Sequence, residues 1–164
     1  FHRAGIGVSM QFYFPPEMRT ADILDVLKYW VLEYHIDGFH LMSANLSMDL
    51  IAGDPLLAET MLLTGEWNAR RGGDGKRNVG WLSDGFLYDM RRFIKGDDNM
   101  INQFLFHVRE NKDEIGIVNS IARWDGFRLV DLVSYERKHN EENGEDNKDG
   151  MDYNCSWNLS LIHI

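Results

Sequence analysis

Apolar residues along the first part of the chain alternate between short runs and helix-spaced stripes, which is typical of alternating strands and helices. Residues 4–14 are rich in β-branched and aromatic side chains and stop at two prolines, which predicts a buried strand. Apolar positions in residues 20–35 recur at helical spacing, which predicts a helix that Thr20 can cap. Residues 36–42 are short and apolar, which predicts a second buried strand before a break at Asp54.

The alternation continues through the rest of the chain. A short apolar run at residues 61–63 is followed by a glycine- and arginine-rich stretch at residues 70–77, which predicts a loop. Two helices are then expected, around residues 86–94 and around residues 101–108. A strand at residues 115–122, an apolar segment at residues 129–135 and a polar tract at residues 138–154 complete the order. Gly96 is expected to end the first of these helices, and Asp97 or Asp98 can cap the second. Both helices are expected to be half buried.

This order of elements indicates an α/β fold. Strands that alternate with helices imply parallel βαβ units, which form either an open doubly wound sheet or a barrel. No glycine fingerprint of the dinucleotide-binding or P-loop type follows an expected strand. The usual reason to prefer the open nucleotide-binding sheet is therefore missing, and the barrel is favoured.

Composition narrows the possible partners. The chain is 44% hydrophobic, and no apolar run approaches the roughly 20 residues that span a bilayer, so a membrane partner is not expected. With 17 basic and 26 acidic residues the net charge is −9, which repels phosphate backbones, so nucleic acid is not expected either. The lone Cys155 has no partner for an internal disulfide and is expected to be inert.

Three segments are spelled distinctively. They are KYWVLEYHIDGFHLM at residues 28–42, DMRRFIKGD at residues 89–97, and WDGF at residues 124–127 followed by DLVSY and KHNEENGEDN. In this order they resemble the glycogen-debranching, isoamylase-like branch of the α-amylase superfamily. In that family, patterns such as RYWV…VDGFRFD, DDVRRFWRGD and HDGFTL…DLVSY…KHNEANGENN lie between the third helix and the segment after the seventh strand.

The resemblance implies a (β/α)₈ TIM barrel. A complete barrel needs eight strands and about 250 residues, so residues 1–158 are expected to be a fragment with roughly strands 3 to 7, not closed, whose partner is the remainder of its own barrel. Residues 159–164 depart from the family and are expected to be an artefactual tail. The resemblance also implies an α-glucan partner (glycogen, amylopectin or a related oligosaccharide) and, together with the cysteine usage, a cytoplasmic location. No cofactor and no metal are expected.

Two carboxyl groups roughly 5–5.5 Å apart are needed by retaining glycosidases, one as nucleophile and one as acid. The residue matching the family's nucleophile is Met42, preceded by His40 where the family has arginine. A thioether offers no anionic oxygen for a glycosyl-enzyme intermediate. The acid position matches Gly65, with Glu66 one residue later, and a one-residue shift on a strand turns a side chain to the other face.

Other parts of the family's site have changed too. The third carboxylate is retained as Asp125, but its histidine neighbour is Trp124, and the strand-three pattern appears as QFYFPP at residues 11–16. We therefore expect a catalytically impaired relative, a pseudoenzyme of carbohydrate metabolism. The catalytic candidates are Asp125 and Glu66, and the substrate-binding candidates are His40, Trp67, Trp124 and Tyr135.

Alternatives remain open on the sequence. An active hydrolase of α-1,6-glucosidic bonds could use relocated carboxylates, drawn from Glu66, Asp125, Asp49 and Asp54. A non-catalytic α-glucan-binding module is a second alternative. Residues 145–150 resemble half of a calcium loop but lack its final glutamate, where Ser156 stands. The histidines at positions 35, 107 and 139 lie on separate elements, which favours surface or capping roles over zinc.

Overall fold

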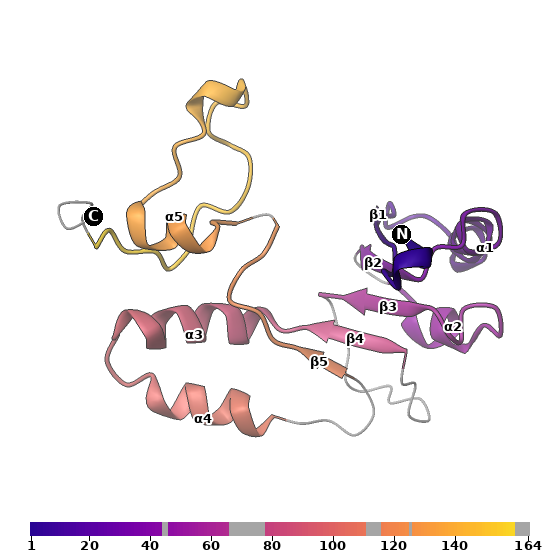
Figure 1. Cartoon of the computed structure of the whole chain (residues 1–164), viewed down its shortest axis with the longest axis horizontal. Coiled ribbons are helices and arrows are strands. Elements are labelled where there is room, and N and C mark those ends of the chain that lie inside the picture. The colour runs from indigo at the N-terminus through magenta and orange to yellow at the C-terminus, as the bar shows by residue number, and fades with distance from the viewer. Residues whose placement is uncertain (44–45, 66–77, 111–115, 125, 160–164) are drawn as a thin grey trace. The chain divides into compact units, whose positions relative to one another are not determined.

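The structure is a computed structural model that describes residues 1–43, 46–65, 78–110, 116–124 and 126–159 (Figure 1). The chain divides into two compact units. Unit 1 comprises Phe1–Leu82 with Asn111–Val118, and unit 2 comprises Ser83–Glu110 with Asn119–Ile164. No helix in the described ranges has both the length and the apolar character that a bilayer-spanning segment needs.

A five-stranded parallel sheet forms the centre of unit 1. Its strands are β1 (Ser9–Tyr13), β2 (Gly38–Met42), β3 (Met61–Thr64), β4 (Val79–Leu82) and β5 (Gly116–Val118), and they lie side by side in chain order. A doubly wound sheet reverses its strand order at a switch point, whereas a (β/α)₈ barrel always adds the next strand to the same edge. Within the described residues β1 and β5 do not pair, so the sheet is not closed. The predicted α/β fold, a partial barrel of about five strands, is confirmed.

The core of unit 1 lies on the face of the sheet that carries two helices. These are α1 (Thr20–Tyr34) and α2 (Met48–Gly53), which is preceded by Ser47. The buried apolar cluster consists of Phe14, Ile23, Leu27, Ile36, Phe39, Leu41, Met48, Ile51, Ala52, Leu57, Leu62 and Val79. Because successive strand residues point to opposite faces, Phe39 and Leu41 enter this core while His40 and Met42 lie on the other face.

That second face, which we call the open face, carries few buried side chains. Tyr13 of β1 is 69% exposed, and Met61 of β3 is also exposed. Gly38 is covered by its neighbour on β3, since a Cβ there would lie 3.1 Å from both the Cε and the backbone oxygen of Met61. In a complete barrel this face would point inward and be filled by layers of side chains from all strands.

Unit 2 is built from short helices and a long loop. The elements are α3 (Asp84–Lys95), α4 (Ile101–Arg109), α5 (Leu129–Ser134) and the 3₁₀ turn η2 (Glu141–Asn143), which lies in a loop drawn at the top of Figure 1. Arg91 of α3 is only 2% exposed and donates to the backbone oxygens of Ile121 (2.8 Å) and Asn154 (2.9 Å). It thereby ties α3 to two later segments of the same unit.

Several local predictions need correction. The first strand begins at Ser9, after a 3₁₀ turn η1 (His2–Ala4), and it is half exposed because it is an edge strand of the described sheet. Strand β4 was not predicted. The expected caps Thr20 and Asp97 or Asp98 do not cap, since the N-cap positions are Arg19 and Met100. The strand predicted at residues 115–122 is limited to β5, and the loop predicted at residues 70–77 lies outside the described residues.

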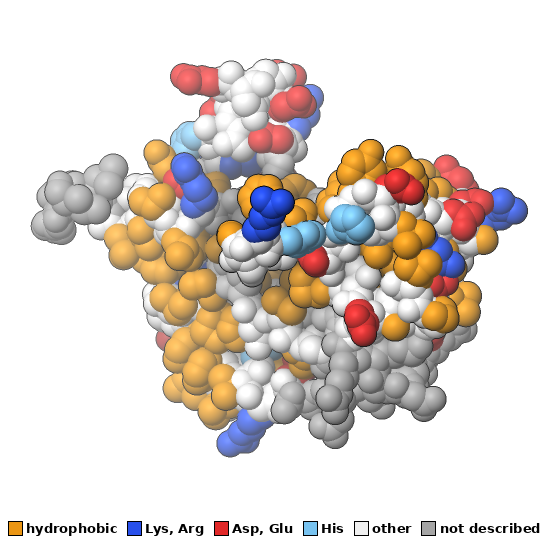
Figure 2. Space-filling view, turned by 45° about the vertical axis from the view of Figure 1, so that its right-hand side comes forward, with side chains coloured by type: hydrophobic (Ala, Val, Ile, Leu, Met, Phe, Trp, Pro, Cys, Tyr) orange, Lys and Arg blue, Asp and Glu red, His pale blue; other side chains and the backbone are white. Residues whose placement is uncertain are grey.

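The two predicted helices of unit 2 differ in burial. Helix α3 buries Leu87, Met90 and Arg91 and ends at Gly96 as predicted. Helix α4 buries only His107, so the prediction that it is half buried is wrong. Its apolar residues Ile101 and Phe106 are exposed, and the space-filling view shows apolar side chains gathered on several parts of the surface (Figure 2).

Candidate functional site

Three side chains on the open face form a connected group across β1 and β2. Gln11 pairs in register with His40, and its Oε1 lies 3.2 Å from the His40 Nδ1. The Gln11 Nε2 donates to the Met42 Sδ at 2.9 Å. His40 and Met42 are half buried, and both lie on the open face as expected for strand neighbours two residues apart. We call Gln11, His40 and Met42 the open-face triplet.

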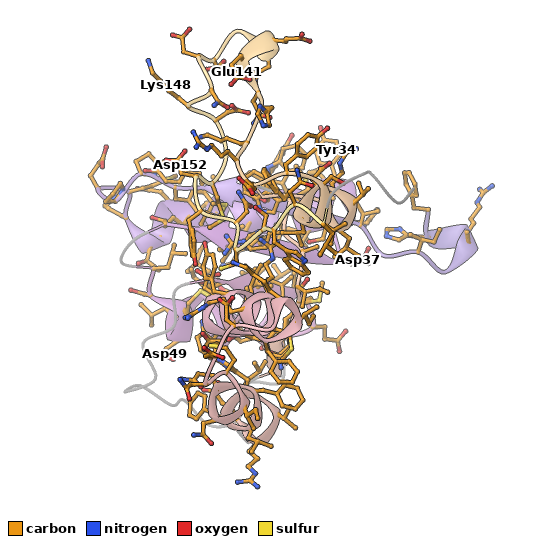
Figure 3. All side chains as sticks on the ribbon, turned by 90° about the vertical axis from the view of Figure 1, so that its left-hand side faces the viewer. Tyr34, Asp37, Asp49, Glu141, Lys148 and Asp152 are labelled. Atoms are coloured by element: carbon orange, nitrogen blue, oxygen red, sulfur yellow. The ribbon has the colours of Figure 1, made fainter. Side chains whose placement is uncertain are left out.

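Asp37, the aspartate of the IDGF segment, lies before the start of β2. Its Oδ2 accepts a hydrogen bond from Val8 N (2.6 Å) and lies 2.7 Å from His2 Nε2, while its backbone oxygen accepts from Met61 N (3.0 Å). Figure 3 shows Asp37 on the ribbon away from Asp49. The Val8 hydrogen bond, followed by that of His2, lowers the pKa of Asp37 below its ordinary value of 3.8. This motif residue therefore aligns the beginnings of β1, β2 and β3.

Of the four carboxylates considered as relocated catalytic groups, Asp49 and Asp54 lie in the described residues, and their surroundings differ. Asp54 forms an ion pair with Lys28, with 2.6 Å between Oδ2 and Nζ, and its Oδ1 accepts from Leu56 N at 3.0 Å. The hydrogen bond from Lys28 is the largest cause of the lowered pKa of Asp54. Asp49 is exposed on the first turn of α2. Asp54 thus connects α1 to the segment after α2, which is a structural task.

A hollow of about 710 Å³ lies within unit 2. Its lining residues are Trp124, Gly126, Phe127, Arg128, Asp131, Tyr135, Arg137, Lys138, His139, Asn140, Asp149, Gly150, Met151 and Asn154. Trp124 is 63% exposed and Tyr135 is 45% exposed. The Tyr135 ring lies 6.5 Å from Phe127 and 5.4 Å from His139, so it is bordered by other rings on this surface. A volume of several hundred Å³ with both ring faces and polar groups is suitable for a small polyhydroxylated ligand.

One side of the hollow is a loop closed by Asp149. The Asp149 Oδ2 accepts hydrogen bonds from the amides of Asn140 (3.1 Å) and Asn143 (2.9 Å). Lys138, which is almost fully buried, donates to the Asp149 backbone oxygen at 3.0 Å and pairs with Asp152. We call residues 138–150 the Asp149 loop. The polar groups of this loop bind one another, which gives the polar tract a defined conformation. Figure 3 shows Glu141 and Lys148 at the far end of the loop.

The predicted site residues fall into three groups. Trp124 and Tyr135 line the same hollow, although ten residues separate them in the sequence. His40 and Met42 lie together on the open face of unit 1. The remaining candidates Asp125, Glu66 and Trp67 lie outside the described residues.

The histidines outside the triplet have separate surroundings. His35 ends α1 in a left-handed conformation, and its backbone N–H caps the carbonyls of Trp30 and Val31, so its predicted capping role is confirmed. His139 is exposed beside Tyr135. His107, in contrast, is buried, with its Nε2 3.0 Å from Asp89 Oδ2 on α3. A surface role for His107 is therefore wrong, because α3 supplies a carboxylate partner that its sequence spacing does not reveal.

Sequence reasoning missed the contribution of Gln11, and it missed Arg137, Lys138, Asn140 and Asp149 around the hollow. The even spacing of residues within β1 places Gln11 on one face, but the parallel register that sets it against His40 is not visible in the sequence. The spacing of asparagines and Asp149 in the polar tract was a usable signal, since such side chains commonly bind nearby backbone and amide groups.

Comparison with known proteins gives consistent relatives. No protein-family model matches the chain. It is 31% identical over 182 residues to the glycogen operon protein GlgX homolog of Mycobacterium tuberculosis, covering 96% of this chain and 25% of that protein. It is 37% identical over 171 residues to the chloroplastic isoamylase 3 of rice (85% and 21%), and 35% identical over 164 residues to the glycogen debranching enzyme of Erwinia tasmaniensis (85% and 25%). The chain spans about a quarter of the length of these curated relatives.

Proposed function

We infer the function of this chain from the family to which it belongs, the glycogen-debranching, isoamylase-like branch of the α-amylase superfamily. Relatives bear the names isoamylase and glycogen debranching enzyme, and those names point to α-glucans as the ligand class for this chain too. We propose that the chain binds α-glucan, such as glycogen, amylopectin or a related oligosaccharide, and that it is impaired in hydrolysis.

Met42 carries the proposal of impaired hydrolysis. It stands where the resemblance expects the nucleophile, and its sulfur accepts a hydrogen bond from Gln11. A thioether cannot form the glycosyl-enzyme ester of a retaining mechanism, and the loss of a covalent nucleophile typically lowers the rate by on the order of a millionfold. The ion pair of Asp54 with Lys28 makes that carboxylate a poor replacement.

The hollow in unit 2 supports the proposal of glucan binding. Trp124 and Tyr135 present ring faces, and the apolar faces of glucose rings pack well against aromatic rings. His139, which is exposed at the hollow, adds a ring nitrogen that can meet sugar hydroxyls. His40 on the open face and Trp67, which lies outside the described residues, complete the proposed substrate-binding residues.

Electrophoresis through gels containing glycogen or amylopectin tests binding. The chain is expected to be retarded, and Trp124→Ala and Tyr135→Ala are each expected to weaken binding by up to about tenfold, which corresponds to roughly 1.4 kcal/mol. Tyr153→Ala is the matched control, because Tyr153 is also exposed in unit 2 but does not line the hollow. Unretarded migration of the folded chain would contradict glucan binding.

Release of reducing sugar from glycogen or pullulan tests catalysis. We expect none above background at high protein concentration. Turnover that disappears in Glu66→Gln or Asp125→Asn would overturn the proposal of impairment and support a hydrolase of α-1,6-glucosidic bonds with relocated carboxylates.

The extent and location of the protein are part of the same proposal. We propose that residues 1–158 supply part of the barrel, that residues 159–164 lie outside it, and that the remainder of the barrel is the structural partner. Removal of residues 159–164 is then expected to leave the circular dichroism spectrum unchanged. We propose a cytoplasmic location, supported by the single, buried, free thiol of Cys155, and cell fractionation tests it.

A further inference from the structure

The hollow in unit 2 is lined by Arg128, Arg137 and Lys138, and two of these cations are paired with carboxylates. The Arg128 Nε lies 3.0 Å from the Asp131 Oδ2, and the Lys138 Nζ lies 2.6 Å from the Asp152 Oδ1. Arg137 differs from them, because among the residues that the structure describes it takes part in no ion pair and no hydrogen bond. Its side chain is exposed, so its guanidinium is accessible to a ligand in the hollow.

Aromatic rings border the hollow close to Arg137 in the chain. Tyr135 and His139, two residues before and two residues after it, both line the hollow, and their ring centroids lie 5.4 Å apart. Trp124 adds a third ring. Ring faces pack well against the apolar faces of sugars, whereas a guanidinium presents a planar fork of donors that matches the oxygens of a phosphate. The hollow therefore combines surfaces for a sugar with a cation for an anionic group.

The carboxylates that line the hollow are already engaged. Asp131 pairs with Arg128. Asp149 accepts the Asn140 and Asn143 amides on its Oδ2, and its Oδ1 is buried. The net charge of −9 repels anions at long range, so an anionic ligand is attracted only through a local contact with an unpaired cation. This favours a ligand with a single charged group on an otherwise neutral body over a polyanion.

We propose that the hollow binds a phosphorylated α-glucan. Arg137 pairs with a phosphate monoester on one glucose unit, while Tyr135 and Trp124 contact the faces of neighbouring sugar rings. A phosphate monoester carries about 1.5 to 2 negative charges at pH 7 and offers acceptor oxygens to the guanidinium fork. The proposal rests on the glucan binding proposed above and names the form of glucan that this hollow prefers.

Electrophoresis through gels that contain amylopectin bearing phosphate monoesters tests the preference. The matched gel contains the same amylopectin after treatment with a phosphatase. We expect the apparent Kd for the phosphorylated polymer to be about threefold to tenfold lower, the range of one charge-assisted contact that stays partly solvated. The difference should shrink when salt is raised from about 0.02 M to about 0.5 M, because salt screens the contact. Equal retardation by both polymers would overturn this inference and leave glucan binding intact.

Two arginine substitutions separate the proposed contact from a general change of charge. Arg137→Gln should bind both polymers equally, with the affinity that the unmodified chain has for the dephosphorylated one. Arg109→Gln removes the same charge from an exposed position at the end of α4 that does not line the hollow, and it should keep the preference. A preference that persists in Arg137→Gln, or that is lost equally in both variants, would overturn the inference, provided that circular dichroism shows both variants folded.

Isothermal titration calorimetry with glucose 6-phosphate, glucose and inorganic phosphate separates the sugar from the anion. Glucose 6-phosphate should bind more tightly than either of the other two, and Arg137→Gln should reduce its affinity to that for glucose. Glucose 6-phosphate that binds no more tightly than inorganic phosphate would overturn the inference, because the rings would then contribute nothing. A chain that binds glucose 6-phosphate through Arg137 but is retarded by neither polymer would contradict the proposed glucan binding and assign the hollow to free sugar phosphates instead.

Discussion

At the scale of single residues, Asp37 links a charge to the alignment of three strands. Its carboxylate accepts from Val8 N and from His2, and both hydrogen bonds favour the charged form, so its pKa in the folded chain lies below 3.8. A depressed carboxyl pKa contributes stability that is fully present above the unfolded-state pKa and is lost as the pH falls through the folded-state pKa.

Asp37→Asn keeps an oxygen that can accept from Val8 N but removes the charge. We expect a lower free energy of unfolding than in the unmodified chain above about pH 4, with the difference disappearing below the folded-state pKa. Urea unfolding at a series of pH values measures this. Asp25→Asn, on the exposed side of α1, is the matched control, and an equal effect of the two substitutions would contradict the proposed role of Asp37.

At this scale, the candidate site was predictable only where the pattern within a single strand was informative. Met42 and His40 could be assigned to one strand face because alternation along β2 is strict. Gln11 could not be connected to them, because that contact depends on the register between β1 and β2, which are separated by the whole of α1. For Asp54 the sequence predicted too much: it suggested a possible catalytic carboxylate, but that carboxylate forms an ion pair with Lys28.

At the scale of secondary-structure elements, glycines let neighbouring strands approach on the open face. A Cβ at Gly38 would lie 3.1 Å from the Met61 backbone oxygen, which cannot move without shifting β3. We therefore expect Gly38→Ala to lower the free energy of unfolding by about 1–3 kcal/mol.

Gly116→Ala is the control for this prediction. A Cβ at Gly116 would meet the Val79 backbone oxygen at an ordinary 3.7 Å. This substitution should be neutral or stabilising by up to about 1 kcal/mol, because it restricts the unfolded chain. Thermal or urea unfolding of both variants compares them, and a Gly38→Ala chain as stable as Gly116→Ala would contradict the close approach of β2 and β3.

Helix caps give a second contrast between elements. The Ser83 Oγ accepts from Phe86 N at 3.2 Å at the start of α3, so Ser83→Ala should cost about 1 kcal/mol. Asp98, which the sequence suggested as a cap of α4, is exposed, and α4 has no side-chain cap. Asp98→Ala should change the free energy of unfolding by less than about 0.5 kcal/mol. Urea unfolding distinguishes the two, and equal losses would contradict this assignment of the caps.

Much of the element order followed from the sequence, and the exceptions have physical causes. Apolar periodicity located α1, α3 and α4, while β2 was clear from its short apolar run. Strand β4 was missed because its four residues, VGWL, include a glycine and are too few for a pattern. The capping aspartate was misassigned because Asp97 instead binds Arg92 and Lys95, partners that compete for the same carboxylate.

The Asp149 loop is an element whose order depends on one side chain. Asp149→Ala removes the acceptor of the Asn140 and Asn143 amides. We expect cleavage of residues 138–150 in limited proteolysis to become several-fold faster, since the loss of two hydrogen bonds costs roughly 1–3 kcal/mol locally. Glu142→Ala, an exposed change in the same loop, should cleave at the unmodified rate. Equal rates for all three chains would contradict the role of Asp149.

At the scale of the whole molecule, repulsion due to the net charge opposes the association between copies that exposed apolar surface favours. Large apolar side chains such as Tyr13 on β1 and Leu32 on α1 are more than half exposed. Exposed apolar groups and the unpaired edge of a strand both favour association between copies. The net charge of −9 at pH 7 repels copies from one another, and it falls to about zero near the sequence pI of 5.0.

Association should therefore rise as the pH falls from 7.5 to 5, and at pH 7.5 it should rise with salt, because about 0.1 M salt shortens the range of charge repulsion to roughly 10 Å. Sedimentation velocity at these pH and salt values measures it. Tyr13→Lys and Leu32→Lys change the net charge equally, but only Tyr13 lies on the open face of an edge strand. If the open face drives association, Tyr13→Lys reduces it more than Leu32→Lys does. Equal reductions of association by the two substitutions would mean that only the added charge matters. If association does not rise at pH 5, the exposed apolar surface does not promote contact between copies.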